Sequence, residues 1–159
     1  MTDFPSPQPL RGQPCPPDRA KSPLNPLKGR EGVRFAGYAA IFDRPDRGGD
    51  VVRAGAFARS LKRGSAGVPL LWQHDLRRPV GRIEYLREDK RGLRVIGRVT
   101  DARAAALVRE RAVTGLSFGY RVRSAAGKAP RELTGLELVE VSLVAFPMQT
   151  LARVHAVEG

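Results

Sequence analysis

The chain has 159 residues, of which 28 are Lys or Arg and 16 Asp or Glu, and 42% are hydrophobic. This length suits one domain, and the apolar fraction excludes a chain that is disordered throughout. The single cysteine, Cys15, excludes an internal disulfide and a cysteine-based metal cluster. The N-terminal residues lack the basic and apolar regions of a signal peptide, and no apolar run approaches the roughly 20 residues needed to cross a bilayer. The sequence therefore predicts a soluble intracellular protein.

The formal net charge of +12 has two interpretations. A basic excess favours an acidic partner such as nucleic acid, because Lys and Arg displace counterions from phosphates. The arginines are nevertheless dispersed along the chain rather than gathered in a run of five or six, which is equally typical of a solvated basic surface. Charge alone does not choose between them.

Proline divides the chain into regions. Eight of the thirteen prolines lie within the first 26 residues. Proline lacks a backbone donor and fixes φ, so this stretch propagates neither helix nor sheet. We therefore predict a disordered arm over residues 1–30, a folded domain over 31–155 and a short tail over 156–159.

The folded part alternates between strand and helix patterns. We predict strands over 33–42, 68–72, 80–86, 93–99, 117–123 and 136–144, and helices over 54–63 and from Thr100 or Asp101 to a stop at Gly115. Residues 88–92 form the turn of a hairpin. About six strands and two helices without a βαβ rhythm indicate an α+β fold, an antiparallel sheet or barrel carrying helices.

Three polar residues lie at or in predicted strands. His74 follows the apolar run that ends at Trp72, a position where reactive side chains often occur; the alternative is a polar loop residue bonded to backbone. Ser117 shares a strand face with Gly119, which leaves room for a substrate backbone to approach the hydroxyl. The letters of residues 115–119 match Gly-x-Ser-x-Gly, but a helix before the serine and a strand after it reverse the order of the hydrolase elbow.

Glu140 lies in the otherwise apolar strand 136–144 and shares a face with Leu138, Ser142 and Val144. A carboxylate among apolar neighbours is costly unless it is paired. It is either a charge at the sheet edge or an acid that orients an imidazole. Together His74, Ser117 and Glu140 supply the base, nucleophile and acid of a catalytic triad.

Other residues compete for the third position of this triad. Asp75 is adjacent to His74. Neighbouring side chains of an extended backbone point to opposite faces, so Asp75 is poorly placed to orient the imidazole. Asp50 lies in a glycine-rich loop and could reach the imidazole, but nothing fixes its distance. His155 lies beyond Pro147, next to the predicted tail. We therefore expect Glu140 to be the third member.

Several segments, in this order and spacing, resemble the prohead proteases of HK97-type tailed bacteriophages. They are GYAAIF (37–42), DVVRAGAF (50–57) before Ser60, LLWQHD (70–75), PVG (79–81), GLSFGY (115–120) and LVEVSLV (138–144) followed by Pro147. The family is distantly similar to herpesvirus assembly proteases, which implies a small, mostly antiparallel β-barrel surrounded by helices. It also implies His74 as general base, Ser117 as nucleophile and Glu140 as third member.

The resemblance implies a serine endopeptidase that cleaves the scaffolding segment of a major capsid protein, and itself, during prohead maturation. Its partner would be the capsid protein precursor inside the assembling prohead, in the cytoplasm of the host bacterium; a homo-oligomer is compatible with this. No cofactor, metal, membrane or nucleic-acid substrate is expected. The alternative is a non-enzymatic basic β-barrel that binds nucleic acid or serves as a capsid scaffold.

Such an enzyme needs backbone N–H groups that stabilise an oxyanion. The loop after the Glu140 strand is the candidate, with donors at Ala145, Phe146 and Met148. Pro147 is excluded because it has no backbone N–H.

Overall fold

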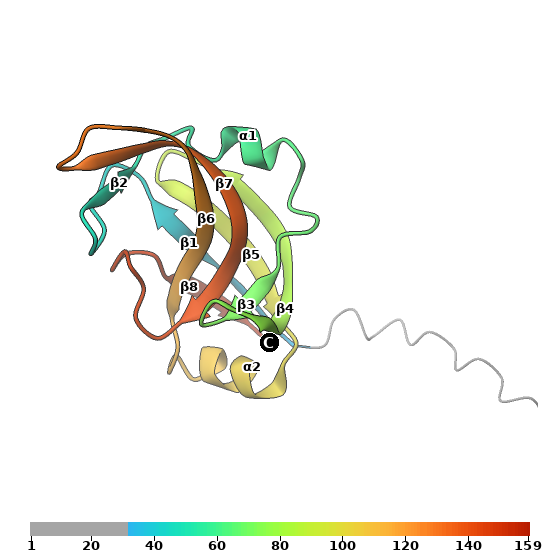
Figure 1. Ribbon diagram of the computed structural model, residues 1–159. Helices are drawn as coiled ribbons and strands as arrows, with labels where there is room; N and C mark the ends of the chain where they lie inside the picture. Colours follow the sequence, from blue (N-terminus) through green and yellow to red (C-terminus); the bar gives the residue numbers. More distant parts are fainter. Residues whose placement is uncertain (1–31) are drawn as a thin grey trace, which may run out of the picture. The chain divides into compact units, whose positions relative to one another are not determined.

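The computed structural model describes residues 32–159, so the predicted arm over 1–30 lies outside the described residues. The described part contains an eight-stranded sheet and two helices. The strands are β1 (Val33–Ile41), β2 (Asp50–Val52), β3 (Leu70–Trp72), β4 (Asp75–Glu88), β5 (Gly92–Val99), β6 (Gly115–Ala126), β7 (Arg131–Val144) and β8 (Val154–Glu158). The helices are α1 (Ala58–Leu61) and α2 (Ala102–Arg109), which lie at opposite ends of the sheet (Figure 1).

The sheet is mixed rather than antiparallel. Its order is β2-β7-β3-β4-β5-β1-β8, and β6 pairs with β7. Most neighbours are antiparallel, but both β2 and β3 pair with β7 in parallel. The predicted, mostly antiparallel arrangement therefore holds for most of the sheet but not for β2 and β3. These two short strands reach β7 through long connections that the local pattern does not reveal.

The strands do not close into the expected barrel. A single bridge between Gly115 and Arg153 joins the start of β6 to the segment before β8. The amide of Leu116 also donates to the carbonyl of Ala152 at 2.9 Å. These contacts bring the two sides of the sheet together at one point without continuing as a ladder.

Strands β6 and β7 are strongly curved (Figure 1), and both contribute to the hydrophobic core, among others through Leu116 and Leu143. Its largest fully buried side chains include Phe35, Phe57, Leu70, Leu71, Leu93 and Leu116. Among residues 32–159, no helix has the length and apolar character needed to cross a membrane.

The first predicted helix is shorter than its apolar pattern suggests. Only Ala58–Leu61 is helical, and Phe57 before it is completely buried. Three glycines and an exposed loop surround this turn, so its anchor is the aromatic side chain rather than helix propensity.

The second helix begins as predicted and ends early. Asp101 is its N-cap, and its carboxylate accepts from the Ala104 amide at 2.8 Å. The predicted stop at Gly115 is wrong, because the chain leaves the helix through Arg111, whose φ is +60°. Gly115 instead begins β6, where a Cβ would lie 2.4 Å from the Val144 carbonyl oxygen.

Two strands have no counterpart in the prediction. β2 has only three residues, and β8 occupies most of the expected tail over 156–159. β8 pairs with β1 at the edge of the sheet. The exposed face of this edge strand accepts polar residues, so the sequence of β8 lacks the apolar alternation by which a strand is predicted.

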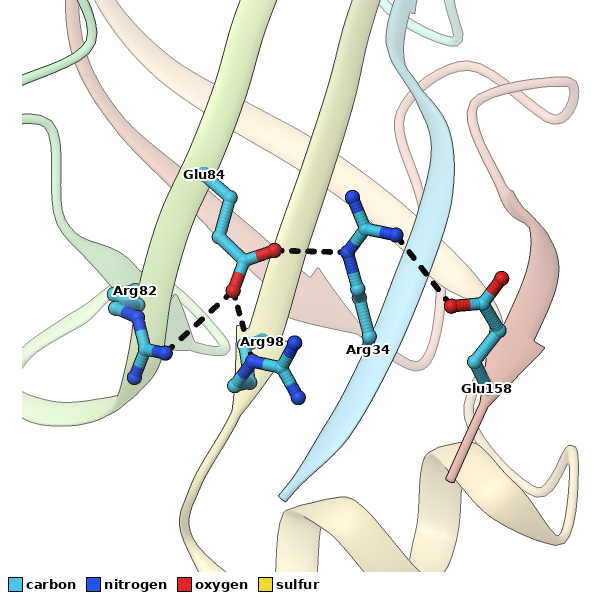
Figure 2. A network of polar contacts seen from close by, with 5 residues as sticks. All are labelled: Arg34, Arg82, Glu84, Arg98 and Glu158. Atoms are coloured by element: carbon cyan, nitrogen blue, oxygen red, sulfur yellow. Dashed lines mark hydrogen bonds and ion pairs between the residues drawn. The ribbon is translucent and has the colours of Figure 1, made fainter. Parts of the chain in front are cut away.

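A row of charges crosses four strands on the outer face (Figure 2). Arg82, Arg98 and Arg34 are neighbours in register on β4, β5 and β1. Glu84 lies among them, with 2.8 Å contacts to the Nε atoms of both Arg34 and Arg98, and Arg34 extends the row to Glu158 at 3.4 Å. Burial opposes ionisation of Glu84, but its bonds to Arg98 and Arg34 leave its pKa below the usual value.

We predict that Glu84→Gln lowers the free energy of unfolding by about 1 kcal/mol, because it removes the carboxylate that separates like charges on adjacent strands. High salt should reduce the loss, since ions screen the remaining repulsion. Urea unfolding at low and high salt measures both effects. Glu110→Gln is the control, because the exposed Glu110 forms no ion pair with any residue of 32–159. An equal loss at both salt concentrations would contradict the prediction.

Candidate active site

The register of β6 against β7 brings four of the relevant residues together. Ser117 faces Ser142, and Gly119 faces Glu140. Directly opposed residues of an antiparallel pair project from the same face, so both pairs share one side of the sheet. Glu140 and Ser142 therefore share a face, as predicted. A register shift between Gly119 and Tyr120 sets Leu138 opposite Tyr120, so the predicted alternation does not extend to Leu138.

His74 reaches this face from a tight turn after β3. Trp72 and Asp75 pair across a two-residue turn, whose central residues Gln73 and His74 have φ of +50° and +62°. Positive φ at both positions is typical of a type I′ hairpin, which usually contains Asn or Gly. A histidine in this conformation costs stability, so its surroundings must hold it.

Two hydrogen bonds donated by backbone amides hold this turn against β7. The Gln73 amide donates to the Leu143 carbonyl at 2.9 Å, and the His74 amide donates to Ser142 Oγ at 3.1 Å. The parallel pairing of β3 with β7 aligns Leu71 with Ser142, so the turn emerges just beyond that serine. The turn thus places the imidazole beside Glu140.

Both carboxylate oxygens of Glu140 have a donor. Oε1 pairs with Nδ1 of His74, and Oε2 accepts from Ser142 Oγ at 2.5 Å. The residue is only 4% exposed, whereas 44% of the His74 side chain is accessible. The buried acid therefore holds one ring nitrogen of an imidazole whose other side reaches solvent.

This contact changes the acidity of the histidine. Its hydrogen bond to Glu140 raises the pKa of His74 above the usual value, although partial burial opposes the shift. The carboxylate thus stabilises the protonated ring, as the third member of a triad does.

Ser117 is 6% exposed, and its hydroxyl forms no hydrogen bond within residues 32–159. The structure therefore brings His74 and Glu140 into contact and places Ser117 one strand away, across from Ser142. Ser117 also lines a hollow of about 50 Å³ with Phe118, Val52 and Met148.

Gly119 has a role beyond the one that its sequence pattern suggests. A Cβ at this position would lie 2.5 Å from Glu140 Oε1 and 2.9 Å from Glu140 Cγ. Real Cβ contacts are essentially never shorter than 3.0 Å. The absent side chain therefore provides space for the carboxyl group of Glu140, not only for an approaching substrate.

The loop expected to supply oxyanion donors follows β7. The Ala145 amide donates to Gln73 Oε1 at 3.3 Å, which links this loop to the histidine turn. Phe146 is 80% exposed and Met148 48% exposed. The loop thus borders the turn and, through Met148, the hollow beside Ser117.

The competitors for the third position have other partners. Asp75 accepts from the amide and side chain of Arg77. Asp50 pairs with Arg131. His155 lies in β8 with its ring centroid 5.7 Å from that of Tyr38.

Sequence reasoning missed two residues of this site, Ser142 and Gln73. Ser142 is a polar residue on the same strand face as Glu140, and that pattern could have identified it. No local signal indicates that the Gln73 side chain reaches Ala145. Within residues 32–159, no group of three or more His, Cys, Asp or Glu side chains could hold a metal ion.

The structure thus holds the His74 imidazole against the buried Glu140 and places Ser117 on the adjacent strand, opposite Ser142. The fold is that of viral proteases: the structure is similar to the KSHV protease, with a TM-score of 0.53 and 13% identity, covering 81% of this chain and 66% of the other. The varicella-zoster virus protease gives a TM-score of 0.51 and 17% identity, covering 80% and 64%.

Residues 22–159 match the model of the Caudovirus prohead serine protease family, and the chain belongs to that family. It is 29% identical over 143 residues to the prohead protease of Enterobacteria phage HK97, covering 82% of this chain. The chain spans 62% of that protein's length. The resemblance inferred from the sequence motifs is confirmed.

We predict that Gly119→Ala displaces Glu140 from His74. Overpacking of this kind should lower the free energy of unfolding by roughly 1–3 kcal/mol, and the pKa of His74 should fall as its partner moves. NMR titration of the ring measures the pKa. Gly135→Ala is the matched control on the same strand pair, since the tightest contact of its Cβ would be the hydroxyl of the exposed Ser124, which can rotate away. An unchanged His74 titration in Gly119→Ala would contradict the prediction.

We also predict that Glu140→Gln lowers the pKa of His74, because it removes the charge that favours the imidazolium. In the unaltered protein the pair stabilises the fold below the ordinary histidine pKa of about 6.5, and this contribution is lost as pH rises through the raised folded value. Denaturant unfolding across this pH range should show that dependence, and Glu140→Gln should remove it.

Asp75→Asn serves as the control for Glu140→Gln, since Asp75 is bonded to Arg77 and not to His74. His155 is an internal reference in the titration, because burial and the charge of Arg91 lower its pKa. Equal His74 titrations in the unaltered protein and in Glu140→Gln would refute the assigned contact.

Proposed function

We propose that the chain is a serine endopeptidase with Ser117 as nucleophile, His74 as general base and Glu140 as the acid that orients the base. The observation that carries this proposal is the His74 imidazole held at Nδ1 by the buried Glu140, one strand from Ser117. Membership of the prohead serine protease family supports it.

The contact at Nδ1 determines the direction of proton transfer. With Nδ1–H donating to Glu140, Nε2 is the nitrogen left to accept a proton from Ser117 Oγ. The hydroxyl oxygen then attacks the carbonyl carbon of the substrate, and the protonated ring is stabilised by Glu140. His74 next donates this proton to the leaving amine, and water hydrolyses the acyl-enzyme ester by the reverse proton path.

Ser117 and His74 must come within hydrogen-bond reach when the substrate is bound. The imidazole has the freedom to do so, since much of its side chain is accessible. Catalytic hydrogen bonds are often long in unliganded enzymes and shorten in the substrate complex.

Backbone amides of Ala145, Phe146 and Met148 are the proposed oxyanion donors. The Ala145 amide is bonded to Gln73, so it must exchange that partner before it can donate to a tetrahedral intermediate. Met148 lines the same hollow as Ser117. Loss of one oxyanion donor costs roughly 10²–10³ in kcat in other serine proteases.

The proposed substrate is the scaffolding segment of a major capsid protein precursor, together with the enzyme itself. The related protein of phage HK97 is a prohead protease, which supports an enzyme acting inside the assembling prohead in the host cytoplasm. The basic surface contributes no catalytic group in this mechanism.

The test is coexpression with the major capsid protein precursor encoded in the same genome. We expect the unaltered chain to cleave the precursor, and Ser117→Ala to abolish cleavage, with a loss of about 10⁶ in rate as for a triad nucleophile. Mass spectrometry of the capsid protein locates the cut. Ser124→Ala, an exposed serine on the same strand, is the control.

Equal cleavage by the unaltered chain and by Ser117→Ala would show that another group is the nucleophile. An intact precursor in both cases, with particles that still assemble around the chain, would favour the non-enzymatic scaffold instead.

A further inference from the structure

Ser142 is a second serine on the face that carries the candidate triad. It is completely buried, directly across from Ser117 and two residues from Glu140. Its hydroxyl oxygen accepts from the His74 amide at 3.1 Å, and its proton is donated to Glu140 Oε2 at 2.5 Å. One side chain therefore contacts both the base residue and the acid.

The proton directions in this bridge are determined by chemistry. A backbone amide can only donate, so Ser142 Oγ must accept from His74. Its single proton is then available for the carboxylate. Because Oε1 of Glu140 faces the imidazole, the bond to Oε2 fixes the rotation of the carboxyl group.

We propose that Ser142 is a positioning residue of the active site, which sets Glu140 and the His74 backbone at the distance that the acid–base contact requires. Its effect on turnover rests on the proposed function, whereas its effect on the titration of His74 does not. Ser142 touches no substrate, because it is wholly buried.

If Ser142 had a purely structural role, its replacement by alanine would affect the protein in the same way as the replacement of Ser60. The Ser60 hydroxyl also accepts a backbone amide bond, from Leu138 on β7 at 3.0 Å, but it has no contact with the candidate triad. Ser60→Ala is therefore a matched control, in which a serine–backbone bond to the same strand is lost without any change at Glu140.

The experiment is a double-mutant cycle on the full chain with Ser142→Ala and Glu140→Gln. Activity is measured on the capsid-protein segment that the unaltered enzyme cleaves. Loss of a hydrogen bond to a charged group should lower kcat by roughly 10- to 100-fold, and KM should stay unchanged. In the Glu140→Gln background, Ser142→Ala should lower kcat by less than about threefold, because residues that act as a unit are not additive.

The second measurement is the NMR titration of His74, which needs no activity. We expect Ser142→Ala to lower the pKa of His74, as a displaced carboxylate favours the imidazolium less, and Ser60→Ala to leave it unchanged. Ser142→Thr, which keeps the hydroxyl, should restore the titration.

The positioning role requires both results. An equal loss of kcat in both backgrounds, or a His74 titration that does not respond to Ser142→Ala, would overturn it. Failure of the proposed function is seen separately, as a Ser117→Ala variant that cleaves as well as the unaltered chain while the titrations behave as expected.

Discussion

The arrangement of this site depends on one buried carboxylate. Glu140 is 4% exposed, and a charge removed from water is costly unless each oxygen has a donor. His74 supplies one donor and Ser142 the other. Gly119 leaves the space that the carboxyl group occupies. Three strands must therefore be neighbours before Glu140 can be accommodated, and this requirement couples the fold to the chemistry.

Strand β7 meets that requirement because it pairs on both edges. β6 lies along one edge, and β2 and β3 pair with it in parallel at separate places. The parallel pairing of β3 is essential, since it ends opposite Leu143 and releases the chain into the turn that carries His74. That turn keeps two non-glycine residues at positive φ, a cost that its bonds to Leu143 and Ser142 offset.

The local sequence predicted what depends on neighbours in the chain. The turn over residues 88–92 and the Asp101 cap each follow from a short pattern, and the structure confirms them. The parallel pairing of β3 with β7 joins residues about 70 positions apart, which no short pattern encodes. The apolar neighbours of Glu140 in its own strand predicted that this carboxylate needs a partner. The distance to His74 could not be predicted, because it depends on the pairing of β3 with β7.

The two facing serines show how environment, rather than residue type, separates their roles in the proposed mechanism. Ser142 is wholly buried, and its proton and its oxygen are both used in bonds to Glu140 and His74. An oxygen in that position cannot attack a substrate without breaking the bridge that orients the base. Ser117 has no such bonds within residues 32–159, and it borders a hollow at the surface. The hydrogen bonds that fix Ser142 as part of the support therefore leave Ser117 as the serine able to give up its proton.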